Sequence, residues 1–126
     1  MRIVVVESPF AGDVPRNLRY LRAALRDCIV NHGEAPYASH AIYTQPGVLD
    51  DGVPQDRTLG MESGFAYKAV AACTVVYTDL GISPGMQAGI DASMTKGYKY
   101  EFRTLGEGWE QRAIECENAF KTRWPE

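Results

Sequence analysis

The chain has 126 residues, of which 45% are hydrophobic and 23% are charged, values that fit one globular domain and exclude a disordered chain. Its 13 Lys and Arg residues against 16 Asp and Glu residues give a net charge of −3, which argues against nucleic acid as a partner. The first apolar run, residues 3–6, is too short for a membrane span or a secretory signal, so no membrane association is expected.

Three cysteines stand far apart in the sequence, and none has Cys-x-x-Cys or His-Cys spacing. Each of them, Cys28, Cys73 and Cys116, lies in an apolar stretch. This pattern predicts buried, reduced thiols rather than a secreted disulfide framework or a structural zinc site. We therefore expect a cytoplasmic protein without a bound metal.

The first half of the chain predicts a strand at 2–7, because a β-branched run there leads into a polar loop at 8–13. Apolar residues spaced by three and four predict a helix that starts at residue 15 or 16 and ends at Gly33. A weaker extended segment at 35–39 precedes a long loop at 40–55, which is either a binding loop or an insertion without function. Four arginines of the first helix indicate a solvated face: Arg16, Arg19, Arg22 and Arg26.

The second half predicts a helix at 56–72 with a face of small residues suited to close packing. A buried strand at 74–78 and a helix at 84–96 follow, then a strand at 98–104 near a sheet edge. A final amphipathic helix covers 109–120.

The alternation of strands and helices predicts one α/β domain over 1–126 with a doubly wound parallel sheet, of the flavodoxin or Rossmann-like type. Ligands of such folds bind outside the carboxyl ends of the strands. Three loops should meet there, at 8–13, from 40 onward and at 79–85. We expect the ligand site between them.

The loop at 79–85 carries the most specific signal. Ser83 can cap the following helix and Pro84 can occupy its first position. A hydroxyl and free N–H groups at a helix start favour an anion such as phosphate. The same serine can also serve as a cap alone, and the two roles are compatible.

Other polar candidates lie near the same edge. His40 falls where the second strand delivers side chains, whereas His32 fits a helix C-terminal cation. Four carboxylates are close to this edge and spacing selects none of them for acid or base work: Glu7, Asp13, Glu62 and Asp79. Dinucleotide, P-loop and Gly-x-Ser-x-Gly motifs are absent from the sequence, which argues against NAD enzymes, NTPases and serine hydrolases.

Four short motifs, in this order, resemble those of the nucleoside 2-deoxyribosyltransferase-like family, over about residues 2–104. They are Ser8-Pro9-Phe10, Pro36-Tyr37-Ala38-Ser39-His40, Arg57-Thr58-Leu59-Gly60 and Ser83-Pro84-Gly85-Met86. The resemblance implies a homo-oligomer that binds a nucleoside or its monophosphate. Many short members are encoded by phages, so it also implies a phage protein in the host cytoplasm.

Members of that family cleave or exchange an N-glycosidic bond with a glutamate nucleophile, an aspartate on the preceding helix and a tyrosine on strand one. The corresponding positions here are Gly89, about Phe65, and Val5, so the usual catalytic groups are missing. The serine and glycine that hold the 5′ oxygen or phosphate in the family match Ser83 and Gly85.

Two hypotheses follow. The chain is either a nucleotide-binding protein without turnover, which sequesters a nucleotide, or an N-glycosidase or 2-deoxyribosyltransferase with relocated acids, of which Glu62 is the best candidate. A purely structural, oligomer-forming domain is a third interpretation. No cofactor is expected, and the predicted ligand contacts are Ser8, Pro9, Phe10, His40, Asp79, Ser83, Gly85 and Met86.

Overall fold

The computed structural model describes residues 1–123 and contains four strands: β1 (Arg2–Glu7), β2 (Glu34–Tyr37), β3 (Cys73–Tyr77) and β4 (Tyr100–Arg103). They form one parallel sheet in the order β2-β1-β3-β4. The chain starts in the middle of the sheet, moves to one edge and returns past its start to the other edge. This is the doubly wound arrangement that the sequence predicted, and the last three residues of the predicted domain lie outside the described part.

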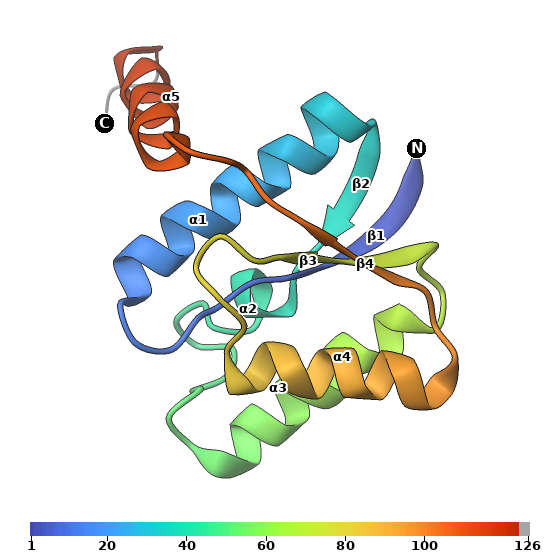
Figure 1. Ribbon diagram of the computed structural model, residues 1–126. Coiled ribbons are helices and arrows are strands. Elements are labelled where there is room, and N and C mark those ends of the chain that lie inside the picture. The colour runs from blue at the N-terminus through green and yellow to red at the C-terminus, as the bar shows by residue number, and fades with distance from the viewer. Residues whose placement is uncertain (124–126) are drawn as a thin grey trace.

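Six helical segments surround the sheet: α1 (Val14–Arg26), the π-helix η1 (Asp27–Asn31), α2 (Ser39–Ile42), α3 (Pro54–Lys68), α4 (Pro84–Lys96) and α5 (Trp109–Arg123). Figure 1 shows α1 and α5 on one face and α3 and α4 on the other. Within residues 1–123, no helix combines the length and the apolar character that a membrane crossing requires.

The centre of the sheet is buried on both faces, at residues 4–6 of β1 and along all of β3, as expected for parallel strands covered on two sides. On the α1 face, Val4 and Val6 of β1 belong to the same buried cluster as Tyr20. On the opposite face, Val76 of β3 packs with Met86 of α4. Burying an aliphatic side chain of this size contributes about 1.5–3 kcal/mol, so these contacts fix α1 and α4 on opposite faces.

The predicted helix at 15–33 is divided, because its last turns are π-helical. The Tyr77 hydroxyl donates to the Asp27 carboxylate at 2.7 Å and lies 3.4 Å from Cys28 Sγ. Two neighbouring residues of the π-helix thus contact one tyrosine of β3.

The segment at 40–55 is not a loop throughout, because α2 occupies its beginning and α3 starts at Pro54 rather than at residue 56. The end of α3 also differs from the prediction, at Lys68 instead of residue 72. The Ala72 amide donates to the Ile3 carbonyl at 2.8 Å, so the chain has already joined β1 at that point.

The arginine face of α1 is not simply solvated. Arg16 pairs with Glu110 at 3.2 Å, and Arg19 and Arg22 pair with Glu117 at 3.2 and 3.0 Å. These ion pairs attach α5 to α1. Cys28 and Cys73 are buried, as predicted. Cys116 is exposed on α5, so the prediction of a buried thiol was wrong for this residue.

Candidate functional site

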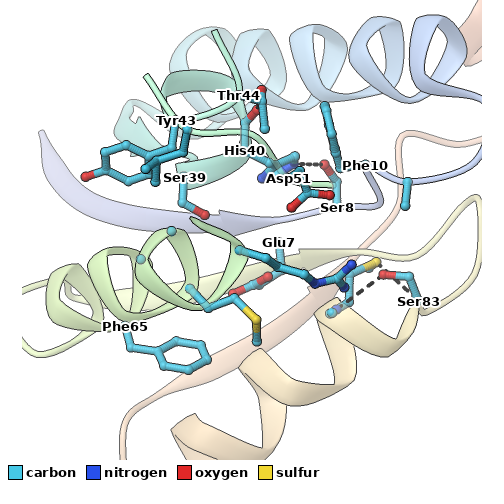
Figure 2. A pocket seen from close by; sticks show the side chains of 18 of the residues that line it. Glu7, Ser8, Phe10, Ser39, His40, Tyr43, Thr44, Asp51, Phe65 and Ser83 are labelled. Atoms are coloured by element: carbon cyan, nitrogen blue, oxygen red, sulfur yellow. Dashed lines mark hydrogen bonds between the residues drawn. The ribbon is translucent and has the colours of Figure 1, made fainter. Parts of the chain in front are cut away.

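A cavity of about 320 Å³ lies at the carboxyl ends of β1 and β3. The chain leaves β1 toward one face of the sheet and leaves β3 toward the other, and this divergence opens the crevice in which ligands of doubly wound folds bind. Figure 2 shows side chains from the β1 end, α2, α3 and the start of α4 around it. The predicted contacts that line the cavity are Ser8, Phe10, His40, Ser83, Gly85 and Met86.

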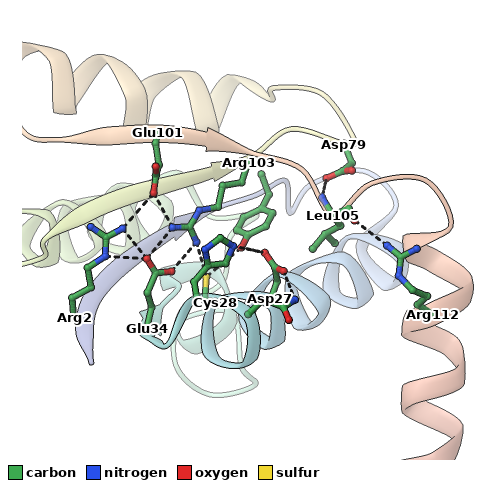
Figure 3. Close-up of polar contacts among 12 residues, drawn as sticks. Arg2, Asp27, Cys28, Glu34, Asp79, Glu101, Arg103, Leu105 and Arg112 are labelled. Carbon is green, nitrogen blue, oxygen red and sulfur yellow. Dashed lines mark hydrogen bonds and ion pairs between the residues drawn. The ribbon is translucent and has the colours of Figure 1, made fainter.

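Three predicted residues are not among those that line it: Pro9, Asp79 and Glu62. Asp79 instead accepts hydrogen bonds from the Tyr20 hydroxyl at 2.5 Å and from the Leu105 amide at 2.8 Å, the second of which Figure 3 shows. It therefore joins the end of β3 to α1 and to the segment before α5. Glu62 is exposed on α3.

Asp51 and Asp56 line the cavity, and so does Glu7, the last residue of β1 and one of the four carboxylates that the sequence placed near this edge. Its Oε1 lies 2.8 Å from Lys68 Nζ, and the Lys68 side chain is only 2% exposed. Lys68 also donates to the Gly89 carbonyl at 3.1 Å and to Ser93 Oγ at 3.3 Å. Burial raises the pKa of the Glu7 carboxyl, and the Lys68 ammonium opposes this shift.

Gly89 provides the space for this carboxylate. A Cβ atom at Gly89 would lie 2.5 Å from Glu7 Oε1, closer than real Cβ contacts come. Position 89 is where the family resemblance places a glutamate, so the cavity has a carboxylate beside this position that comes from β1 instead of α4. Val5 and Phe65, the other two positions at which the resemblance expects catalytic groups, also line the cavity and are apolar.

A serine–histidine pair lies on the α2 side, where Ser8 Oγ is 2.8 Å from His40 Nε2. Burial lowers the pKa of His40 to about 4, so the imidazole is neutral at pH 7. A base this weak is poorly matched to deprotonating a serine hydroxyl. The pair is better suited to fixing two hydrogen-bonding groups on the wall of the cavity.

The start of α4 forms the opposite wall. Ser83 Oγ accepts from the Met86 amide at 3.2 Å, so the capping role of this serine is confirmed. The Arg57 guanidinium lies beside it: a Cβ atom at Gly85 would be 3.8 Å from Arg57 Nη2. Within residues 1–123 this guanidinium has no carboxylate partner. A free cation and a helix N-terminus thus meet at one end of the cavity.

The sequence alone did not select Arg57 or Lys68. Arg57 belongs to one of the four motifs, and this membership could have pointed to it as a site residue. Lys68 resembles an ordinary surface cation at a helix end. In the described part of the chain, no group of three or more His, Cys, Asp and Glu side chains is arranged to hold a metal ion.

Comparisons with known proteins give one match. No curated protein and no solved structure matches this chain. A family model described as a domain of unknown function, DUF7768, matches residues 2–103. This span runs from β1 to the end of β4 and includes every residue that lines the cavity, whereas α5 lies outside it. Because the match covers most of the chain, the protein belongs to the DUF7768 family.

Proposed function

We propose that this protein binds a nucleoside 5′-monophosphate, or a closely related nucleotide, in the cavity at the ends of β1 and β3. The observation that carries the proposal is the meeting of Arg57 with the N-terminus of α4 at one end of that cavity. Its volume of about 320 Å³ lies at the lower end of the range for small-molecule sites.

The phosphate group would lie against the first turn of α4. A helix N-terminus offers backbone N–H donors and a favourable dipole, and Gly85 in this first turn lies beside the Arg57 guanidinium. Arginine adds charge-assisted hydrogen bonds, which are about twice as strong as neutral ones. The Ser83 hydroxyl stands at the same corner.

The nucleoside would lie along the rest of the cavity. Its walls are largely apolar there, with Met61 and Phe65 from α3 and Tyr43 after α2. Apolar and aromatic walls with a few polar groups are typical of sites that bind a planar base. In Figure 2, Ser83 and Phe65 lie on opposite sides of Glu7, which is consistent with a phosphate end and a base end.

Binding without turnover is the leading form of this proposal. The positions that would carry the usual catalytic groups are Val5, Phe65 and Gly89, and none of them bears an ionisable side chain. The Glu7 carboxylate is held by a buried ammonium group, which weakens it as a nucleophile. A protein of this kind would sequester its nucleotide.

A second candidate is cleavage or transfer at the N-glycosidic bond. It is favoured by one observation, the carboxylate of Glu7 inside the cavity with a raised pKa. Incubation with nucleotides and deoxynucleotides, followed by chromatography for free base, separates the two candidates. Base release that Glu7→Gln abolishes would replace the binding proposal, whereas intact nucleotide after long incubation would support it.

Isothermal titration calorimetry with nucleoside 5′-monophosphates and the corresponding nucleosides tests the binding proposal. We expect Arg57→Ala to weaken monophosphate binding on the order of ten- to a hundredfold and to change nucleoside binding little. Arg22→Ala is the matched control, because Arg22 lies on α1 and pairs with Glu117. The absence of heat with every nucleotide would refute the proposal.

A further inference from the structure

A buried ion pair faces the cavity, and the protein itself does not use all of its hydrogen-bonding capacity. The Glu7 side chain is 17% exposed and its partner Lys68 is 2% exposed. A buried ion pair often stabilises a protein less than apolar side chains of similar size would. A pair that borders a ligand cavity therefore calls for a functional reason.

Lys68 and Glu7 differ in how many of their hydrogen-bonding groups remain without a partner. Lys68 donates to Glu7, to the Gly89 carbonyl and to Ser93 Oγ, which accounts for all three of its N–H groups. An ionised carboxylate has about four acceptor sites, and within residues 1–123 Lys68 is the one side chain that pairs with it. The cavity consequently presents unused acceptors at Glu7, so a ligand should bring donors to this point.

The position of Glu7 along α4 indicates which part of a nucleotide carries those donors. Both carboxylate oxygens lie within 2.5–3.2 Å of the Cβ position of Gly89. Gly89 follows Gly85 by four residues, one helical turn or about 6 Å along the same face of α4. With a phosphate at Gly85, the pentose reaches the next turn, because it is bonded directly to the phosphate, and the base lies beyond it.

We propose that the Glu7 carboxylate accepts hydrogen bonds from the 2′- and 3′-hydroxyls of the bound nucleotide, so that the cavity selects ribonucleotides over 2′-deoxyribonucleotides. Two neighbouring hydroxyls match two carboxylate oxygens, and a carboxylate is a common partner of ribose hydroxyls in nucleotide-binding folds. This inference rests on the nucleotide site proposed above. Glu7 is a specificity residue in it and carries out no chemical step.

Calorimetry with adenosine, guanosine, cytidine and uridine 5′-monophosphates, each beside its 2′-deoxy form, tests the inference. We expect the ribonucleotide of the preferred base to bind on the order of ten- to a hundredfold more tightly than the deoxy form. Glu7→Gln should remove most of this difference by weakening the ribonucleotide. Glu115→Gln, at an exposed position on α5, is the matched control and should leave the difference intact.

Two further variants keep the test decisive if Glu7→Gln unfolds. The double variant Glu7→Gln with Lys68→Met removes both charges, so that neither is left unpaired in the interior. Gly89→Ala keeps Glu7 but forces its carboxylate away, because the added methyl group would lie 2.5 Å from Oε1. Both should lose the preference for ribose.

The outcomes separate this inference from the proposed function. Nucleotide binding with equal affinity for the two sugars, or with a preference for the deoxy form, would overturn the role of Glu7 and leave the nucleotide site standing. A ribose preference that survives in Glu7→Gln, in the double variant and in Gly89→Ala would also overturn the role of Glu7 and leave the nucleotide site standing. The absence of binding by every nucleotide would refute the nucleotide site, and the inference with it.

Discussion

Lys68 Nζ lies 2.8 Å from Glu7 Oε1, and this contact joins the end of β1 to the end of α3. Through the Gly89 carbonyl the same ammonium group also holds α4. One ion pair thus links three of the elements that form the cavity. Changes to this pair should therefore affect both the stability of the fold and the shape of the site.

Replacing Lys68 by Met should destabilise the protein by about 3–5 kcal/mol, because the Glu7 carboxylate would remain buried without a partner. Urea denaturation at pH 7 measures this loss. Adding Glu7→Gln to the same chain should recover part of the stability, since the uncompensated charge is then gone. A single Lys68→Met variant as stable as the unmodified protein would contradict the buried pairing.

Asp79 should act on stability and not on binding, although the sequence placed it among the ligand contacts. Asp79→Ala removes the acceptor of the Tyr20 hydroxyl and of the Leu105 and Gly106 amides. We expect a loss of at least about 2 kcal/mol in thermal or urea unfolding. Nucleotide affinity, measured below the unfolding transition, should stay within about threefold, and a larger drop would return Asp79 to the site.

The two roles of Ser83 can be separated by substitution. Ser83→Ala removes the helix cap and should cost about 1 kcal/mol of stability. Ser83→Asp keeps a capping carboxylate, so its stability should stay near that of the unmodified protein. Its negative charge, however, should repel a phosphate and abolish monophosphate binding in calorimetry. Unchanged binding by Ser83→Asp would show that no anion enters this corner.

The stability of the fold should fall in acid because of Glu34. This side chain is 2% exposed and lies between Arg103 at 2.7 Å and Arg2 at 2.8 Å (Figure 3). Hydrogen bonds from Arg103 lower the pKa of its carboxyl to about 2, against an ordinary value of 4.5. A lowered folded-state pKa means that this stabilisation is present above pH 4.5 and is lost as the pH falls toward 2.

Urea unfolding at a series of pH values from 5 to 2 measures this loss. Glu34→Gln should be less stable at pH 7, because Arg2 and Arg103 lose their buried partner and keep only the exposed Glu101, and its stability should depend less on pH in that window. A variant whose profile keeps the full slope would assign the acid sensitivity to other groups. His40 is one of these groups. Because burial lowers the pKa of His40 to about 4, its protonation reduces the stability of the fold at a higher pH than Glu34 does, as the pH falls from 6.5 to 4.

Much of the fold could be predicted because its signals are local. The buried run of β3 and the Ser83-Pro84 start of α4 each depend on a few adjacent residues. Gly97 closes α4 with φ of 72°, the left-handed conformation expected of a glycine cap. The π-helix η1 and the early end of α3 were missed, because each follows from a contact with a distant strand.

The site was predictable in position but not in its polar detail. Loops at the carboxyl ends of parallel strands had to meet, and Ser8, His40 and Ser83 from three such loops line one cavity. The choice of Glu7 over Glu62 depends on the space left at Gly89, which is far from Glu7 in the sequence. No spacing rule connects residues whose contact is created by the packing of a helix on a sheet.

The most direct measurement of the central claim is a series of ¹H–¹⁵N correlation spectra of the protein titrated with a nucleoside 5′-monophosphate. We predict that the Gly85 amide shows one of the largest shifts, because it would donate to the phosphate, and that the matching nucleoside leaves it nearly unmoved. Shifts confined to the α1 and α5 face, or an unmoved Gly85 amide at saturating monophosphate, would contradict the account.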